Sequence, residues 1–268
     1  MILGISNLAF KEKSFRDVVR LIAQTPIKGI EIAPKVLWDD PVTTSKVQRK
    51  SVQDLCAEEG IKVIGLQALL FGHEELKIFD TDSLRLRCED YVKQMIELCA
   101  DLGGEFIVFG SWKNRKRDQM PFDKACAIAE TFFLSLAHCA KDLGVQICLE
   151  PVSSGYGCDF LTTADESAQL VAKVNHPSFR LMLDTGSMWM NQEPCEEKII
   201  KYANRIAHMH INDPFLSPPG AKGFDHRGIK AALEKVEYQG WLTFEFFPTG
   251  VTLEEDIKLA LDCYDHKG

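Results

Sequence analysis

The sequence lacks several features that would each assign it to a large class of proteins. Its nine cysteines form no CxxC pair, and several lie at apolar positions of expected helices and strands, which favours reduced, buried thiols over disulfides. No apolar segment approaches the length of a membrane-spanning helix. The first residues show neither a basic leader nor a cleavage-site pattern, so we expect no signal peptide and a soluble, cytoplasmic protein.

An excess of basic residues is also missing. The chain carries 31 Lys and Arg against 39 Asp and Glu, a formal net charge of −8. Nucleic acids and anionic membranes bind basic surfaces, so this balance argues against both as partners. No Pro-, Gly- or Ser-rich linker and no block of like charges divides the chain, and 46% of its residues are hydrophobic. We therefore expect a single globular domain over residues 1–268.

What the sequence does contain is a regular alternation of apolar runs and amphipathic stretches. The runs typical of strands are residues 2–6, 28–33, 62–67, 105–110, 145–150, 179–184, 206–211 and 242–247. The stretches typical of helices are residues 14–24, 43–59, 83–102, 121–143, 163–174, 193–204, 226–238 and 252–265. Because the apolar runs are continuous, they indicate parallel strands covered by helices. Eight such units of about 33 residues predict a (β/α)8 TIM barrel, with a doubly wound open sheet as the alternative.

Capping residues support several of these helix boundaries. Ser14 and Thr163 stand where helix N-caps are expected. Gly60, Gly144 and Gly240 follow expected helix ends, where glycine adopts the left-handed conformation without a steric penalty.

Ionisable residues occupy the carboxyl ends of four consecutive predicted strands. They are Glu150, Asp184, His210 and Glu245, each about one β/α unit from the next. In a closed barrel these side chains point toward one place near the axis, where three carboxylates and an imidazole would repel one another without a cation. Any one of them alone could be a strand-end salt bridge or a helix cap. Together they predict one divalent metal ion, and the oxygen-rich set favours Mn²⁺, Mg²⁺ or Co²⁺ over a closed structural zinc site.

The chain resembles the xylose-isomerase-like barrel superfamily, which includes sugar-phosphate isomerases, ketose 3-epimerases and endonuclease-IV-type enzymes. The matching segments are CLEP (148–151), YGCDFLTTADES (156–167), LMLDTGSM (181–188), HMHIND (208–213) and GFDHRGIKAALEKVEYQGWLTFEFF (223–247). The resemblance implies that Glu150, Asp184, His210 and Glu245 bind one metal ion. Mn²⁺ is the first choice, with Mg²⁺, Co²⁺ or Zn²⁺ as alternatives.

The resemblance also implies a reaction on a small carbohydrate. In isomerases and epimerases of this group, the residues matching Glu150 and Glu245 exchange the proton beside the substrate carbonyl, through an enediolate. We therefore expect a metal-dependent isomerase or epimerase acting on a sugar, sugar acid or sugar phosphate. A dehydratase or lyase on a related substrate, and a non-catalytic carbohydrate-binding barrel, are the alternatives. The sequence leaves a homo-oligomer open.

The sequence departs from its relatives at several positions. Ser187 follows DTG where endonuclease-IV-like members and many epimerases carry a histidine. An arginine expected after the HxH strand has no aligned counterpart, although Lys222 or Arg227 could replace it. A second glutamate that epimerases carry shortly after the residue matching Glu150 is also missing. These departures weaken a ketose 3-epimerase assignment. The DNA-repair assignment is weaker still, since too few of the seven histidines fall at strand ends for a trinuclear zinc cluster.

Candidate substrate contacts lie in the same expected loops. The segment GSWKNRKR (110–117) is the densest basic run, and Lys113 or Arg115 could bind an anionic group on the substrate. Trp112 beside them could stack on a sugar ring. A solvated loop is the alternative for this run. Glu31 and Gln67 complete the predicted substrate-binding set together with Lys222, although Glu31 could instead form a salt bridge to a neighbouring strand. His208 is expected to lie below His210 as a core residue or a support for the site.

Overall fold

Eight parallel strands close into a barrel in sequence order. The structure is a computed structural model that describes residues 1–10 and 13–265. The strands are β1 (Ile2–Ser6), β2 (Gly29–Ile32), β3 (Lys62–Leu66), β4 (Phe106–Phe109), β5 (Gln146–Leu149), β6 (Phe179–Asp184), β7 (Ile206–Ile211) and β8 (Trp241–Phe244). Because β8 pairs with β1, no strand edge is left open. This confirms the predicted (β/α)8 barrel and rules out the open doubly wound sheet.

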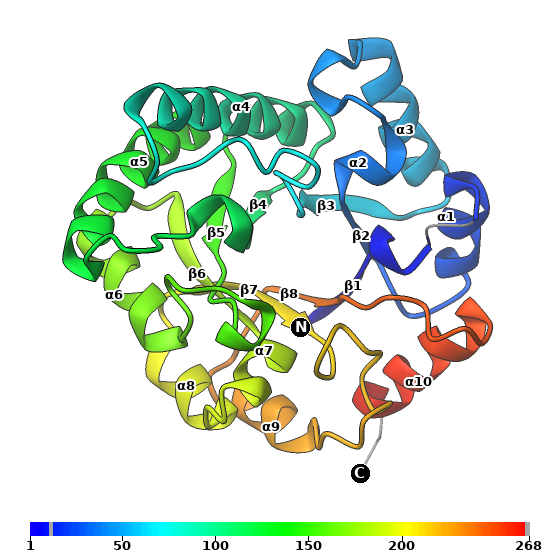
Figure 1. Ribbon diagram of the computed structural model, residues 1–268. Coiled ribbons are helices and arrows are strands. Elements are labelled where there is room, and N and C mark those ends of the chain that lie inside the picture. The colour runs from blue at the N-terminus through cyan, green and yellow to red at the C-terminus, as the bar shows by residue number, and fades with distance from the viewer. Residues whose placement is uncertain (11–12, 266–268) are drawn as a thin grey trace.

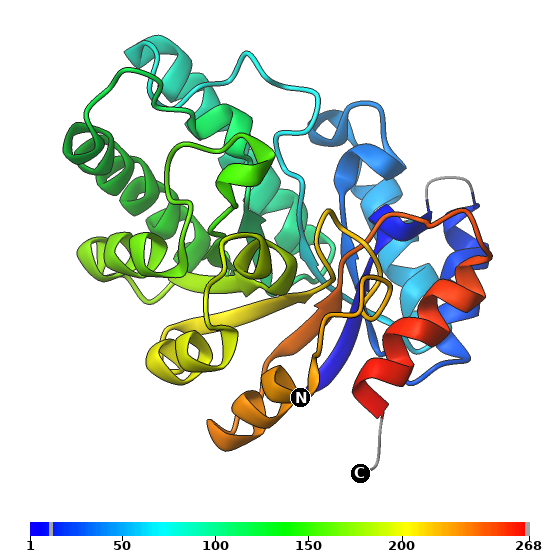
Figure 2. The ribbon, with the colours of Figure 1, turned by 60° about the horizontal axis from the view of Figure 1, so that its bottom comes forward.

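Helices surround the strands, as Figures 1 and 2 show from two directions. They are α1 (Phe15–Ala23), α2 (Pro34–Leu37), α3 (Lys46–Glu58), α4 (Asp82–Asp101), α5 (Phe122–Asp142), α6 (Ala164–Val174), α7 (Thr185–Met190), α8 (Cys195–Tyr202), α9 (Arg227–Lys235) and α10 (Leu253–Asp265). Short 3-10 helices are η1 (Asn7–Phe10), η2 (Pro41–Thr43), η3 (Trp112–Arg115) and η4 (Ser154–Tyr156). All eight predicted helices are present. The additional α2 and α7 are too short to produce a periodic sequence signal.

The predicted caps are confirmed at both N-termini. The side chains of Ser14 and Thr163 accept hydrogen bonds from the backbone N–H groups of Asp17 and Glu166. The prediction for Gly240 was wrong, because α9 ends at Lys235 and the left-handed residue after it is Glu237, with φ of 52°.

The inside of the barrel is apolar at the amino ends of the strands and polar at the carboxyl ends. Ile64, Phe106, Val108, Cys148 and Met182 form a buried apolar cluster between the strands. A larger core fills the space between the strands and the helices. Because the amino end is filled by this cluster, the barrel leaves space for chemistry at its carboxyl end.

Several functional residues lie one position beyond the strands in which we predicted them. Gln67, Glu150 and Glu245 follow β3, β5 and β8 directly. Each still donates its backbone N–H to the neighbouring strand: Gln67 to Ile32 O at 2.9 Å, Glu150 to Phe109 O at 3.2 Å and Glu245 to Ile211 O at 3.3 Å. These bonds keep the three side chains in the alternating pattern of the strands, pointing toward the barrel axis.

A register shift in β3 sets the direction of Gln67. Ile30 pairs with Val63, but Glu31 pairs with Gly65, so β3 has one extra residue at Ile64. This irregularity puts Gln67 on the same inward face as Glu31.

Across the described residues, no helix is both long and apolar enough to cross a membrane.

Candidate active site

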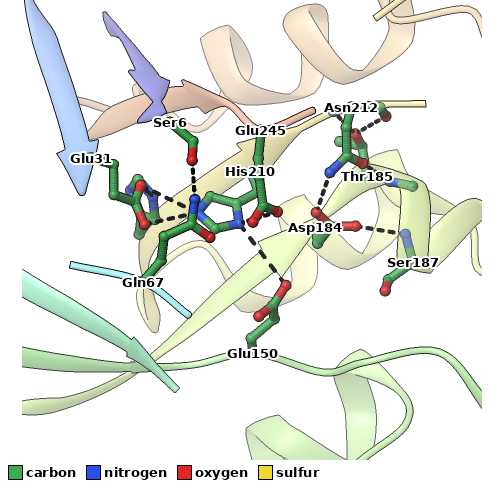
Figure 3. Close-up of polar contacts among 12 residues, drawn as sticks. Ser6, Glu31, Gln67, Glu150, Asp184, Thr185, Ser187, His210, Asn212 and Glu245 are labelled. Carbon is green, nitrogen blue, oxygen red and sulfur yellow. Dashed lines mark hydrogen bonds and ion pairs between the residues drawn. The ribbon is translucent and has the colours of Figure 1, made fainter. Parts of the chain in front are cut away.

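Glu150, Asp184, His210 and Glu245 converge at the carboxyl end of the barrel. Each offers one ligand atom, and these atoms all lie within 4.8 Å of one another. His210 Nδ1 lies 3.0 Å from Glu245 Oε2 and 3.9 Å from Glu150 Oε1. Figure 3 shows the four side chains facing a common space above the strands. The four strand-end residues predicted from the sequence therefore come together.

Two hydrogen bonds hold the carboxylate of Asp184 in place next to Glu150, His210 and Glu245. Its Oδ1 accepts from the backbone N–H of Ser187 at 2.6 Å, and its Oδ2 accepts from Asn212 Nδ2 at 2.6 Å. The side-chain oxygen of Asn212 also accepts a hydrogen bond from the backbone N–H of Gly186, at 2.8 Å. Sequence reasoning missed Asn212, although its place directly after β7 was a usable signal.

Glu31 lies below His210 and contacts both histidines of β7. Its carboxylate is 3.1 and 3.2 Å from His210 Nε2 and 2.9 Å from His208 Nε2. All three side chains are fully buried, so Glu31 cannot reach substrate hydroxyl groups and the predicted substrate contact was wrong. The alternative expectation, a salt bridge, describes its position, but the partners lie on β7 across the barrel and not on a neighbouring strand. With Nε2 of His210 directed at Glu31, its Nδ1 faces the three other carboxylates.

Burial and like charges dominate the electrostatics of the site. Burial raises the pKa of Glu150 to about 8, and the charge of Glu245 adds to this rise. The same two causes raise the pKa of Asp184 to about 6. Burial by itself would lower the pKa of His210, but Glu245 and Glu31 raise it well above its ordinary value. Burial would raise the pKa of Glu31, yet His210 and His208 hold it well below its usual range.

These residues fit a divalent metal ion. The carboxyl groups repel one another when ionised, which a bound cation would reverse. The Nδ1 atom of His210 is buried and has no well-directed hydrogen bond in the part of the chain that the structure describes. Three carboxylates and one imidazole nitrogen are a common donor set for Mn²⁺-like ions. The group is therefore a candidate divalent-metal site.

A pocket with a volume of about 340 Å³ opens directly above this group. Every loop that follows a strand contributes to its lining. Among the predicted site residues, the lining includes Gln67, Trp112, Lys113, Glu150, Asp184 and Glu245. Lys113 also forms an ion pair with Glu74, and Gln67 donates a hydrogen bond to Ser6.

The prediction for Arg115 was wrong. Its side chain is fully buried, and its guanidinium donates to the backbone carbonyls of Phe109 at 3.2 Å, Glu150 at 2.8 Å and Leu161 at 3.4 Å. Arg115 thus joins the ends of β4 and β5 to the loop that follows, and it does not face the pocket. The sequence could not distinguish it from its exposed basic neighbours, because burial depends on which loops close over it.

Lys222 also lies away from the pocket. It is exposed, and its backbone N–H donates to Asp213 Oδ2 at 2.6 Å. Arg227, the alternative, is paired with Asp225 on the surface. Asp213 Oδ1 also lies 2.7 Å from His226 Nε2. These bonds to Asp213 hold the loop after β7 in a turn in which the Lys222 side chain is exposed.

Comparisons with known proteins agree with the barrel fold. A family model described as xylose isomerase-like TIM barrel matches residues 19–265. L-ribulose 3-epimerase of Methylomonas sp. (strain DH-1) is 30% identical over 125 residues, which cover 47% of this chain and 42% of that protein. D-psicose 3-epimerase of Agrobacterium fabrum (strain C58 / ATCC 33970) is 30% identical over 128 residues, which cover 47% of this chain and 44% of that protein.

A solved structure of 3-keto-D-glucoside 4-epimerase from E. coli, in its apo form, is similar with a TM-score of 0.81. It is 18% identical and covers 98% of this chain and 100% of that chain, so it supports the fold. The alignments with the two curated epimerases span less than half of their length.

Proposed function

The chain belongs to the xylose isomerase-like TIM barrel family, and from that premise we propose that it is a metal-dependent isomerase or epimerase of a sugar, sugar acid or sugar phosphate. The observation that carries the proposal is the convergence of Glu150, Asp184, His210 and Glu245 beneath a pocket of sugar size. The 3-epimerase relatives, which match part of the chain, support the same reaction class.

Two of the four residues are suited to move protons as well as to hold an ion. Glu150 follows β5 and Glu245 follows β8, with β6 and β7 and their ligands between them. The two carboxylates therefore approach a substrate in the pocket from different sides. One removes the proton next to the substrate carbonyl, and the same or the other carboxylate returns it. Proton return on the opposite face inverts the carbon, which is epimerisation.

Asp184 and His210 have a holding role. Asp184 keeps its position through Ser187 and Asn212, and His210 keeps its position through Glu31. A divalent ion held by these residues would supply Lewis-acid polarisation of the substrate carbonyl, which would make the neighbouring carbon more acidic. We propose Mn²⁺ as the ion, with Mg²⁺, Co²⁺ and Zn²⁺ as alternatives, because the donors are mostly oxygen.

Substrate contacts are proposed for three pocket residues. Gln67 presents an amide next to the metal ligands, Trp112 offers an aromatic face, and Lys113 lies at the edge of the pocket. The lysine must leave Glu74 to bind an anionic group, which makes its contribution smaller than that of a free cation.

Deuterium exchange tests the reaction. The protein loaded with Mn²⁺ is incubated in D₂O with a panel of aldoses, ketoses and their acids or phosphates. The proposal expects isomerised or epimerised sugar of conserved mass apart from deuterium at the carbon next to the carbonyl. Glu150→Gln or Glu245→Gln should slow exchange by roughly 10²–10⁴-fold for the residue that acts as the base. Loss of water from the substrate would point to a dehydratase instead, and full conversion without deuterium would overturn the proton-transfer route.

A further inference from the structure

The outer part of the pocket has a different character from its base. Apolar side chains line it from the loops after six strands: Leu8, Val36, Phe71, Trp112, Leu216 and Phe247. We call these six residues the apolar mouth. The ionisable groups lie below it, at Glu150, Asp184 and Glu245. A ligand that fills the pocket therefore meets carboxylates at the base, and at the outer end it meets apolar groups together with Lys35 and the Lys113–Glu74 ion pair.

Much of the apolar mouth is open to solvent. Phe71 is 67% exposed, Phe247 is 38% exposed and Val36 is 37% exposed. Next to them, Phe215 is 65% exposed and contacts the ring of Tyr156 edge-on, with 6.0 Å between ring centroids. Large apolar side chains that gather around a pocket without being buried indicate a surface that binds an apolar group.

The backbone around Leu216 is strained in a way that brings these side chains to the pocket. Phe215 and Leu216 are consecutive bulky residues with φ of 62° and 53°, in the left-handed region that such residues rarely adopt. Reciprocal backbone hydrogen bonds between Asp213 and Ser217, at 2.9 and 3.2 Å, close the turn that holds them. Phe247 N–H donates to Leu216 O at 2.9 Å and joins this turn to the loop after β8. Strain of this kind persists where the surrounding structure enforces it, and it is common at ligand sites.

Three polar side chains in the outer pocket already have protein partners. Lys35 donates to the carbonyl of Asp39, and Lys113 pairs with Glu74. Asn114 donates to the carbonyls of His73 and Leu76, at 2.7 Å each. A sugar chain with a hydroxyl group on every carbon would find few free partners here, and unpaired hydroxyl groups lose binding free energy. A group without hydroxyl groups loses nothing of this kind, and a sugar ring avoids the loss only where its apolar face contacts the protein and its hydroxyl groups stay in solvent.

We propose that the apolar mouth is a subsite for a ring-bearing substituent, so that the substrate is a substituted sugar rather than a free monosaccharide. The reacting sugar lies at the ionisable base, and its substituent packs against Phe71, Leu216 and Phe247. This inference rests on the proposed function for the position of the sugar. The shared chemistry of the substituent is a ring with an apolar face, either an aromatic group or a second sugar ring, since both stack on aromatic side chains.

Binding measurements on the Mn²⁺-loaded protein test the subsite without turnover. Methyl and phenyl glycosides of D-glucose, D-galactose and D-mannose, together with cellobiose, are titrated by calorimetry. The phenyl glycoside of at least one sugar, or cellobiose, should bind up to about tenfold more tightly than the matching methyl glycoside, as one ring contact provides. Phe71→Ala and Leu216→Ala should each reduce this ratio toward one, and Phe71→Tyr should restore it.

The control is Leu86→Ala on α4, which removes an apolar side chain that is 59% exposed and does not line the pocket. It should leave the ratio unchanged. A preference for phenyl over cellobiose identifies an apolar substituent, and the reverse identifies a second sugar ring. The subsite is overturned if no ring-bearing ligand binds more tightly than its methyl counterpart, or if the ratio survives in both alanine variants. If neither free sugars nor keto sugars that carry a ring substituent exchange deuterium while the ring preference persists, the proposed reaction is removed and the subsite remains.

Discussion

Asp184 combines two tasks that can be separated by one substitution. Asp184 is the N-cap of α7, because its Oδ1 accepts a hydrogen bond from the backbone N–H of Ser187. Asp184 is also a candidate metal ligand, and its negative charge lies next to His210. In Asp184→Asn an amide oxygen can still cap the helix, but the negative charge is lost.

We therefore expect Asp184→Asn to lower the affinity for Mn²⁺ by orders of magnitude with a smaller change in thermal stability. Metal titration by calorimetry measures the first effect and thermal unfolding the second. Asp159→Asn is the matched control, because Asp159 also accepts backbone N–H bonds, from Arg117 at 3.0 Å and Asp118 at 2.9 Å, outside the ligand group. Unchanged Mn²⁺ affinity in Asp184→Asn would remove Asp184 from the ligand set.

Gly110 is the second residue whose identity the site requires. A Cβ atom at this position would overlap with Oε2 of Glu150. The φ of Gly110 is not in the left-handed region, so alanine is compatible with the backbone itself.

Gly110→Ala should therefore displace the Glu150 side chain and weaken Mn²⁺ binding by about 10–100-fold while the barrel stays folded. Circular dichroism and metal titration check the two halves of this expectation. The complementary control is Gly60→Ala, where φ is +70° and no atom lies within 4 Å of the added Cβ. That variant should lose stability and keep its metal affinity. Equal losses of affinity in both variants would contradict a local effect at Glu150.

At the scale of elements, Arg115 connects the carboxyl ends of two strands. Its guanidinium bonds the carbonyls of Phe109, Glu150 and Leu161. The first and the last also accept backbone N–H groups, so Arg115→Met mainly removes the donor to Glu150 O. A buried carbonyl without a partner costs about 1–3 kcal/mol, and we expect the free energy of unfolding, measured by urea denaturation, to fall by about that amount.

Lys113→Ala provides the contrast, since its ion pair with Glu74 is exposed and such pairs contribute about 0–1 kcal/mol. A substrate-binding arginine would instead raise KM in the variant and leave the unfolding free energy unchanged. That outcome would return Arg115 to the role that the sequence suggested.

At the scale of the whole molecule, the site couples pH, metal binding and stability. Burial and the charge of Glu245 raise the pKa of Glu150 to about 8, and the same causes raise the pKa of Asp184 to about 6. In an unfolded chain these carboxyl groups titrate near their ordinary values of about 4. At these two carboxyl groups the folded, metal-free protein therefore binds more protons than the unfolded chain between about pH 4 and pH 8, and their contribution to stability falls as the pH rises through this range.

Mn²⁺ should replace these protons. We expect the increase in Tm on adding Mn²⁺ to be larger at pH 8 than at pH 6, and we expect protons to be released on binding near pH 7. Calorimetry in buffers with different ionisation enthalpies measures the released protons. Glu150→Gln should reduce the release, because the amide does not titrate. A metal-induced Tm increase that is independent of pH would show that these carboxyl groups are ionised before the ion binds.

The sequence by itself determined the barrel and the candidate ligands. The alternation of apolar runs and amphipathic stretches is a local property, and eight repeats of it leave few ways to bury every strand. In a closed barrel, side chains alternate between the inside and the outside along each strand. The sequence could therefore predict that Glu150, Asp184, His210 and Glu245 meet inside the carboxyl end.

Only the tertiary structure decided what surrounds those four residues. Arg115, Lys113 and Lys222 look alike in the sequence, but the folding of the loops buries the first, leaves the second at the pocket and carries the third away. The partners of Glu31 also depend on the closed barrel, because only there do the side chains of His208 and His210 on β7 reach Glu31 on β2. The apolar mouth depends on loops far apart in the chain, whose contacts leave no periodic signal because they arise from packing rather than from local conformational preference.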